Sequence, residues 1–171
     1  MLQYGRGDAS AFETLYLRHK DRLFAYLLRN CASRDLASEL FQDVWARVIA
    51  HREGYVDKGR FGGWLYRLAH NRLMDYFRTV PRQALPLEDV ADPVAPSHEQ
   101  PERQAQAAGQ RRRILRALAN LPEEQRTAFL LKEEGELSLE EIAEVTEVGR
   151  ETVKSRLRYA LAKLRQELAD V

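Results

Sequence analysis

Prolines divide this chain more sharply than any other feature of its sequence. Five of the six prolines fall between Val80 and Pro101, in "VPRQALPLEDVADPVAPSHEQP". Proline removes a backbone donor and biases the preceding residue toward extended conformations, so this stretch is not expected to form a regular helix or strand. We therefore predict a flexible linker over residues 80–109 between two domains, residues 1–79 and 110–171. A loop folded over one compact domain is the alternative.

On both sides of the linker, apolar residues recur at three- and four-residue spacing, whereas strand patterns are nearly absent. This spacing predicts an all-α fold of two small helical domains. Ser33 and Ser138 are expected to cap helices, the latter in a capping box with Glu141, and Pro122 suits the first turn of a helix. The predicted helices are Ala9–Asn30, Arg34–Arg52, Phe61–Thr79, Glu99–Asn120, Pro122–Glu134, Leu139–Thr146 and Arg150–Leu168.

Composition argues against several classes of protein. No apolar run approaches the roughly 20 residues that span a bilayer. The N-terminal residues also lack the apolar core of a signal peptide, so a cytoplasmic protein is expected. The single cysteine, Cys31, excludes an intramolecular disulfide. His19, His51, His70 and His98 show no metal-binding spacing, so we predict no enzymatic activity, no metal and no cofactor.

The overall net charge of +1 conceals an uneven distribution of charge along the chain. Residues 1–79 carry 13 basic and 9 acidic side chains. From Leu121 to Glu147 there are nine acids against two bases, whereas Val148 to Leu168 has six bases against two acids. A basic terminal segment behind an acidic one indicates an oriented surface for a polyanion.

The C-terminal segment "LSLEEIAEVTEVGRETVKSRLRYALAKLR" has the spacing of a helix-turn-helix, whose second helix enters the major groove of DNA. Val153 and Leu157 form the apolar stripe of that second helix. Glycine is frequent near the position of Glu147, but here Gly149 comes two residues later, so a turn of a different shape is possible. The alternative is a plain antiparallel pair of helices whose basic face is solvated. The candidates for DNA contact are Arg150, Glu151, Thr152, Lys154, Ser155 and Arg158.

The segment "RFGGWLYRLAHNRLMDYFR" carries a second candidate for nucleic-acid binding. At 100° per residue, Leu65, Ala69 and Leu73 fall on one apolar stripe. The opposite side combines an aromatic ring, an amide and two guanidiniums, which suit base stacking, base-edge pairing and phosphate contact. In the alternative, the tryptophan covers the rim of the core and the arginines are solvated. These outward residues are Trp64, Arg67, Asn71 and Arg78.

The preceding helix segment, "SRDLASELFQDVWARVIAHR", has an acidic side. Asp35, Glu39 and Asp43 recur every four residues, flanked by Gln42. Like charges at this spacing repel by a few tenths of a kcal/mol each, so the pattern does not stabilise the helix. An acidic stripe is unsuited to DNA and indicates a basic protein partner. A solvated face is the alternative.

Together these segments resemble the extracytoplasmic-function group of bacterial sigma-70-type sigma factors. The resemblance is carried in order by "GDASAFETLYLRHKDRLFAYL", "DLASELFQDVWARV", "FGGWLYRLAHNRLMDYFR" and "LRALANLPEEQRTAFLLKEEGELSLEEIAEVTEVGRETVKSRLRYALAKLR". It implies sigma region 2 over residues 1–79 and a region 4 helix-turn-helix over residues 110–171. A protein of this family binds core RNA polymerase, recognises the −10 and −35 promoter elements and assists promoter opening.

The resemblance also implies roles for the candidate residues. Glu39, Gln42 and Asp43 would face the clamp helices of the polymerase β′ subunit, with Asp35 on the same stripe. Lys154, Ser155 and Arg158 would read the −35 element, while Arg150 and Thr152 hold its backbone. Contacts with the −10 element would come from Asp57, Lys58, Arg60, Phe61, Trp64, Arg67 and Asn71.

Further partners implied by the family are the polymerase β flap, promoter DNA and an anti-sigma factor. The alternative function is a free-standing helix-turn-helix regulator whose N-terminal helices bind a ligand or dimerise. The acidic stripe distinguishes the two functions, because only a sigma factor needs it to bind polymerase.

Overall fold

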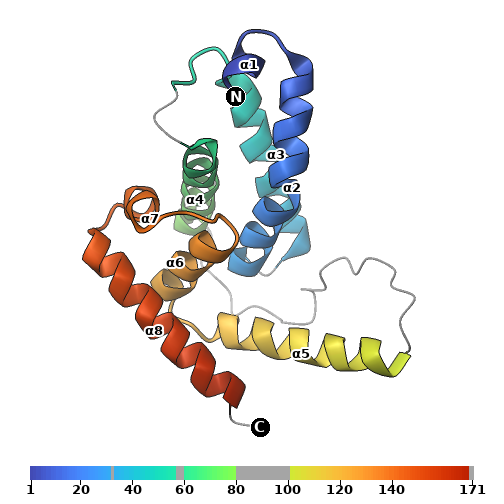
Figure 1. The fold of residues 1–171 in the computed structure, drawn as a ribbon, viewed down its shortest axis with the longest axis vertical. Coiled ribbons are helices and arrows are strands. Elements are labelled where there is room, and N and C mark those ends of the chain that lie inside the picture. The colour runs from blue at the N-terminus through green and yellow to red at the C-terminus, as the bar shows by residue number, and fades with distance from the viewer. Residues whose placement is uncertain (32, 57–59, 80–100, 170–171) are drawn as a thin grey trace.

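The computed structural model describes residues 1–31, 33–56, 60–79 and 101–169, with only the backbone described for residues 101–106. Every regular element in these ranges is a helix (Figure 1). The all-α prediction is therefore confirmed. The helices are α1 (Leu2–Gly5), α2 (Ala9–Cys31), α3 (Arg34–Ala50), α4 (Phe61–Thr79), α5 (Pro101–Ala119), α6 (Glu123–Glu133), α7 (Leu139–Thr146) and α8 (Arg150–Ala169).

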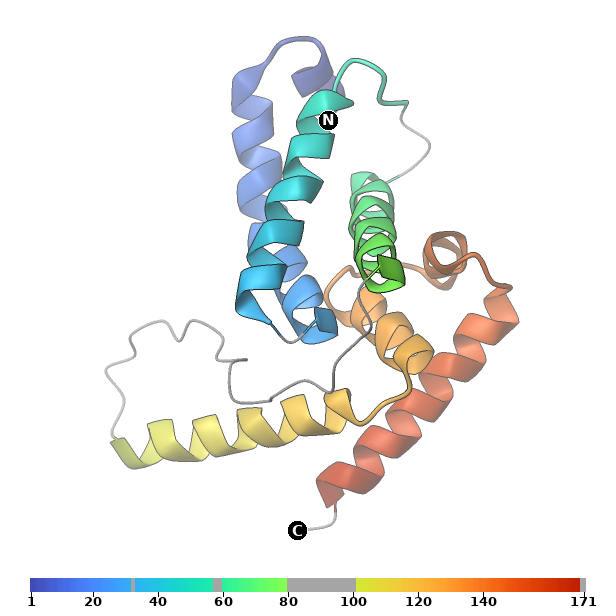
Figure 2. The ribbon, with the colours of Figure 1, turned by 180° about the vertical axis from the view of Figure 1, so that it is seen from behind.

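The N-terminal half is a bundle in which α2, α3 and α4 pack against one another, with the short α1 against α2 (Figure 2). The apolar stripe predicted on α4 is buried, because Leu65, Ala69 and Leu73 are fully inaccessible. No predicted helix covered α1. It ends at Gly5, where a Cβ would lie 2.6 Å from the Arg52 carbonyl oxygen, so only glycine fits without a shift.

In the C-terminal half, α6, α7 and α8 pack together and α5 lies against α8. Helices α7 and α8 form the predicted helix-turn-helix, with Ile142 and Val145 of the first buried. The buried side of α8 comprises Val153, Ala160 and Leu164. A helix with this one-sided burial presents its other side outward.

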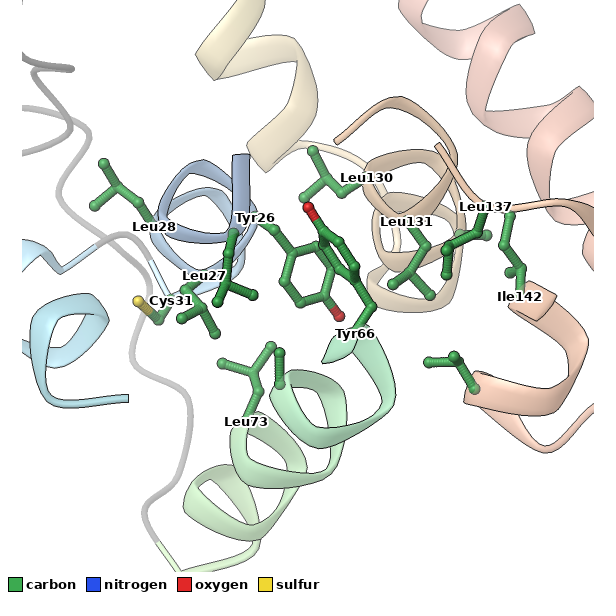
Figure 3. Packing of buried hydrophobic residues seen from close by; sticks show 14 of the residues in the cluster. Tyr26, Leu27, Leu28, Cys31, Tyr66, Leu73, Leu130, Leu131, Leu137 and Ile142 are labelled. Carbon is green, nitrogen blue, oxygen red and sulfur yellow. The ribbon is translucent and has the colours of Figure 1, made fainter. Parts of the chain in front are cut away.

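The two halves share one continuous hydrophobic core. Figure 3 shows Tyr26 of α2 and Tyr66 of α4 beside Leu130 and Leu131 of α6. Leu137, in the connection between α6 and α7, is also fully buried in this cluster. Helix α4 packs against α7, and α2 packs against α6. The two helical domains are therefore in direct contact.

The helix ends agree largely with the local signals in the sequence. The Ser33 hydroxyl accepts from the Leu36 amide, and Ser138 and Glu141 form the complete capping box, as predicted. Each such cap contributes about 1 kcal/mol. Pro122 is a correction: it stands at the N-cap of α6, one residue before the helix begins.

The predicted linker needs a second correction. The sequence predicts residues 101–109 both at the end of the linker and in the helix Glu99–Asn120, and the structure places them in the helix, α5. Pro101 takes the first helical position, where its missing amide hydrogen would have had no helical partner. Residues 80–100, which make up the rest of the predicted linker, lie outside the described residues.

Candidate nucleic-acid and polymerase interfaces

The first candidate interface is the outer side of α8. Its six predicted contact residues lie in the first half of this helix, away from the buried Val153 and Ala160. Ser155 is half-buried and the other five are exposed. Arg150, Lys154 and Arg158 are spaced four residues apart, so their cationic groups form a single row. Such a row can contact phosphates and base edges at once.

Each of these three cationic side chains makes a weak contact with a nearby side chain on the surface of the protein. Arg150 Nε donates to Glu140 Oε1 at 2.5 Å, and Lys154 Nζ lies 3.7 Å from Glu151 Oε2. The Arg158 guanidinium lies 5.0 Å from the centre of the Tyr159 ring. Two hydrogen bonds lower the pKa of the Glu140 carboxyl. The larger effect comes from the backbone of Glu140 itself, and the next comes from the Arg150 side chain. Exposed pairs of this kind contribute little to stability, so phosphates can replace them.

The turn between α7 and α8 keeps a left-handed residue without using glycine. Glu147 has φ 55° and ψ 39°, and the Val148 amide donates to the Ala143 carbonyl oxygen at 3.2 Å. The turn therefore keeps the left-handed conformation at this position, and glutamate adopts it in place of glycine. This conformation costs a non-glycine residue about 1–2 kcal/mol.

Substitutions at Glu147 should reveal this backbone cost. We expect Glu147→Val to lower the free energy of unfolding by about 1–2 kcal/mol, because a β-branched residue fits positive φ poorly. Glu147→Gly should leave stability unchanged or raise it by less than about 1 kcal/mol, since relief of strain is offset by entropy of the unfolded chain. Urea denaturation measures both. Equal stability of the valine and glycine variants would contradict the left-handed turn.

The second candidate interface lies on the first half of α4 and the residue before it. It is called the −10 face after the role that the family resemblance implies, and it is defined by Arg60, Phe61, Trp64, Arg67 and Asn71. Arg60, Arg67 and Asn71 are exposed, whereas Phe61 and Trp64 are half-buried. The other two residues predicted for this site, Asp57 and Lys58, lie outside the described residues.

Trp64 does not stand on a purely outward side of α4. Its ring lies 5.0 Å from the Tyr55 ring and 5.7 Å from the Phe61 ring, measured between ring centres. It also packs at the edge of the hydrophobic core. This placement matches the alternative in which the tryptophan covers the rim, while one part of the ring stays accessible. Arg78, also predicted outward, pairs with Asp75 one turn earlier.

The C-terminal half contacts the −10 face directly. Arg67 Nη2 donates to the Glu144 carbonyl oxygen at 2.9 Å, and Arg60 Nη2 lies 3.5 Å from the Glu136 carbonyl oxygen. Between them lies a hollow of about 220 Å³ lined by Trp64 and Glu141, among others. Nothing in the local sequence patterns predicted these contacts, which depend on the packing of α4 against α7.

The third candidate interface is the acidic side of α3. Asp35, Glu39 and Gln42 are exposed and Asp43 is half-buried. Arg72 of α4, which sequence reasoning did not single out, reaches this side. Its Nε donates to Asp43 Oδ2 at 2.7 Å, and its Nη2 lies 3.7 Å from Glu39 Oε1. The stripe is therefore partly neutralised within the bundle.

Polar contacts also join the two halves beside the −10 face. The Tyr66 hydroxyl donates to the Glu134 carbonyl oxygen at 2.8 Å. Arg29 pairs with the Glu134 carboxylate, and Arg22 pairs with Glu136. The hydrogen bond from Arg22 lowers the pKa of the Glu136 carboxyl. The opposite charges of residues 1–79 and Leu121–Glu147 were the only sequence signal for these pairs.

None of the described helices is both long and apolar enough to cross a bilayer.

Comparison with known proteins agrees with this arrangement of segments. Residues 15–83 match the family described as sigma-70 region 2, and residues 111–164 match sigma-70, region 4. The chain is 31% identical to the RNA polymerase sigma factor CarQ of Myxococcus xanthus, covering 100% of this chain and 97% of that protein. It is 29% identical to the ECF RNA polymerase sigma-E factor of Haemophilus influenzae, covering 89% and 84%.

Two solved structures share the fold over nearly the whole chain. CnrH in complex with the cytosolic domain of CnrY has a TM-score of 0.70 at 22% identity, covering 99% of this chain and 95% of that one. RpoE in complex with the anti-sigma factor NepR from Bartonella quintana has a TM-score of 0.73 at 20% identity, covering 95% and 99%.

The chain belongs to the sigma-70 family, in its extracytoplasmic-function (ECF) group. It is accordingly a sigma factor, which recognises promoter DNA as a subunit of RNA polymerase and is not itself an enzyme. The family prediction from the sequence is confirmed.

Proposed function

We propose that this sigma factor uses the three candidate interfaces for three separate tasks. The acidic side of α3 binds core RNA polymerase, the −10 face holds the −10 element, and the outer side of α8 reads the −35 element. The observation that carries the proposal is the exposure of Arg150, Lys154 and Arg158 on a helix whose other side is buried in a helix-turn-helix. That geometry suits entry into a major groove.

On α8, Lys154, Ser155 and Arg158 contact base edges, whereas Arg150 and Thr152 contact the phosphate backbone. Arg158 and Lys154 are suited to guanine, which presents two acceptors in the major groove. Glu151, adjacent to Thr152, can accept a hydrogen bond from the cytosine amino group.

On the −10 face, the unstacked base is held by Asn71 together with the preceding loop. An amide pairs with a base edge, and the accessible part of the Trp64 ring stacks against a neighbouring base. Arg60 and Arg67 neutralise phosphates. Asp57 and Lys58 belong to the same proposed site by their position in the sequence.

On α3, Asp35, Glu39, Gln42 and Asp43 face the clamp helices of the β′ subunit, and region 4 contacts the β flap. Residues 80–109 connect the two regions across the polymerase, with their last residues in α5. We place the chain in the cytoplasm with its polymerase. A solved relative, RpoE of Bartonella quintana, is bound to the anti-sigma factor NepR, which supports an anti-sigma factor as a partner here.

Transcription with purified core polymerase on a library of genomic fragments tests this function. We expect initiation at a discrete set of sites that share a −10 and a −35 element. Core polymerase without the chain should not initiate at these sites. Initiation that is unchanged by the chain would overturn the proposal and favour a free-standing regulator.

Two substitutions on α8 test the −35 assignment. Arg158→Ala and Lys154→Ala should each cost about 1–3 kcal/mol at the cognate −35 element if these side chains contact bases. Arg165→Ala removes an exposed charge further along the same helix and serves as the control. Fluorescence anisotropy with cognate and scrambled duplexes separates the possibilities. Equal losses on both duplexes would assign the residue to phosphate contact instead.

A further inference from the structure

A hollow of about 640 Å³ lies where α2, α3 and α5 come together. In Figure 2, α5 (yellow) lies below the lower ends of α2 and α3, and α2 and α5 are in contact. None of the residues assigned to the three candidate interfaces lines this hollow, so the proposed function does not account for it. Its volume is in the range that small-molecule ligands occupy.

Three aromatic side chains form one wall of the hollow. The centre of the Phe41 ring lies 5.7 Å from that of Phe24 and 6.1 Å from that of Tyr16. All three side chains are half-buried, so each packs against the core while part of its surface stays accessible. Accessible aromatic surface is what a planar nucleobase stacks against, and it suits every base because every base has a π-face.

Four cationic side chains from three helices line the same hollow. Lys20 and Arg22 belong to α2, Arg34 belongs to α3, and Arg111 belongs to α5. The Arg34 guanidinium lies 5.6 Å from the centre of the Phe24 ring, so the cationic and aromatic parts of the wall adjoin. Guanidinium groups bind phosphate oxygens in pairs, which suits this part of the hollow to a phosphate chain.

Two carboxylates also line the hollow, and each has a cationic neighbour. Asp21 Oδ1 lies 4.0 Å from Lys20 Nζ, and Glu134 pairs with Arg29, which is not part of this lining. Four cations against two carboxylates leave the lining with a balance of +2. The hollow therefore attracts a ligand that carries several negative charges.

We infer that this hollow binds a free nucleoside triphosphate, with its base against the aromatic wall and its phosphates on Arg34 and Arg111. A single strand of nucleic acid needs a groove that follows its backbone, whereas these cations surround one hollow of ligand size. Arg111 belongs to region 4 and the other three cations belong to region 2. The continuous core holds the two regions together, so the walls of the site are already in place.

Two neighbouring arginines of α5 provide a matched pair of variants. Arg111 and Arg112 are both exposed, but only Arg111 lines the hollow. Arg111→Ala and Arg112→Ala therefore make the same change in net charge and remove similar side chains from the surface of one helix. The probes are ATP and GTP that carry a fluorescent methylanthraniloyl (mant) group on the ribose, titrated with the full chain.

We expect saturable binding of at least one mant-nucleotide to the wild type, displaced by the same unlabelled nucleotide. Arg111→Ala should raise its Kd at least about tenfold, because charge-assisted hydrogen bonds to phosphate are lost. Arg112→Ala should stay within about twofold of the wild type. Equal Kd values for the two variants, or no saturable binding to the wild type, would overturn the inference. Neither polymerase nor promoter enters this test, so its failure leaves the proposed function untouched.

Competition experiments separate the base from the phosphates and a free nucleotide from a strand. Unlabelled nucleotide should displace the probe at least about fivefold more effectively than inorganic tripolyphosphate, because only the nucleotide has a base to stack. Equal displacement by tripolyphosphate would refute a base at the aromatic wall. Displacement by a single-stranded oligonucleotide at lower concentration than by the free nucleotide would refute the free ligand and assign the hollow to a strand.

Thermal unfolding gives a readout that does not depend on the fluorescent label. A ligand that binds only the folded chain raises its melting temperature. Saturating unlabelled nucleotide should therefore raise the melting temperature of the wild type and of Arg112→Ala, and raise that of Arg111→Ala by much less. Equal increases for the two variants would contradict a phosphate contact by Arg111.

Discussion

The double charge reversal E39K/D43K is expected to abolish binding of the chain to core RNA polymerase. The substitutions place two cations on the side of α3 that we propose binds a basic surface of the polymerase, and like charges across an interface cost several kcal/mol. Co-elution with core polymerase on size exclusion measures the loss. Binding of a −35 duplex by α8 should be unchanged, since the two surfaces lie on different helices.

The internal ion pair with Arg72 requires its own control, because E39K/D43K also removes both carboxylates near that arginine. Arg72→Ala breaks the same pair but leaves the acidic stripe intact. We expect this variant to keep its affinity for polymerase. If Arg72→Ala were as damaging as E39K/D43K, the stripe would be needed to hold α3 against α4 and not to bind polymerase.

Two neighbouring positions on α4 are expected to have opposite effects. Leu73 is fully buried in the hydrophobic core, so Leu73→Ala should lower the free energy of unfolding by about 2–5 kcal/mol. Asn71 is exposed on the same helix, so Asn71→Ala should stay within about 0.5 kcal/mol of the wild type. Asn71→Ala should instead lose binding to a single-stranded oligonucleotide that carries the −10 element.

Thermal or urea unfolding, followed by circular dichroism, compares the two variants with the wild type. The same preparations are then titrated with the −10 oligonucleotide. A marked fall in melting temperature for Asn71→Ala would assign that residue to the fold. Unchanged DNA binding by a stable Asn71→Ala would remove it from the proposed −10 site.

Features set by neighbouring residues could be predicted from the sequence. The bounds of α4 and α7, the caps at Ser33 and Ser138 and the buried stripe of α4 follow from spacing within one or two helical turns. The outer side of α8 can be predicted in the same way, because residues on the side of a helix opposite its buried apolar stripe are exposed. Here local preference and the final packing agree.

Features that depend on distant parts of the chain were missed. Arg72 meets Asp43 only because α4 lies against α3, and helical periodicity carries no information on that pairing. The angle of Trp64 on the helix predicted an outward position, but its ring packs against the Tyr55 ring at the rim of the core. The charge difference between the two halves was visible, yet only the structure pairs Arg22 with Glu136.

The continuous core has a consequence for synthesis of the protein. Buried Asn30 and Thr127 lie 3.5 Å apart in space but 97 residues apart in sequence. At about 5–20 residues per second, the N-terminal helices leave the ribosome roughly five to twenty seconds before α6. During that interval Tyr26 of α2 lacks its later neighbours Leu130 and Leu131. The N-terminal helices therefore expose core side chains until α6 follows, which favours aggregation at the ribosome well before any promoter is encountered.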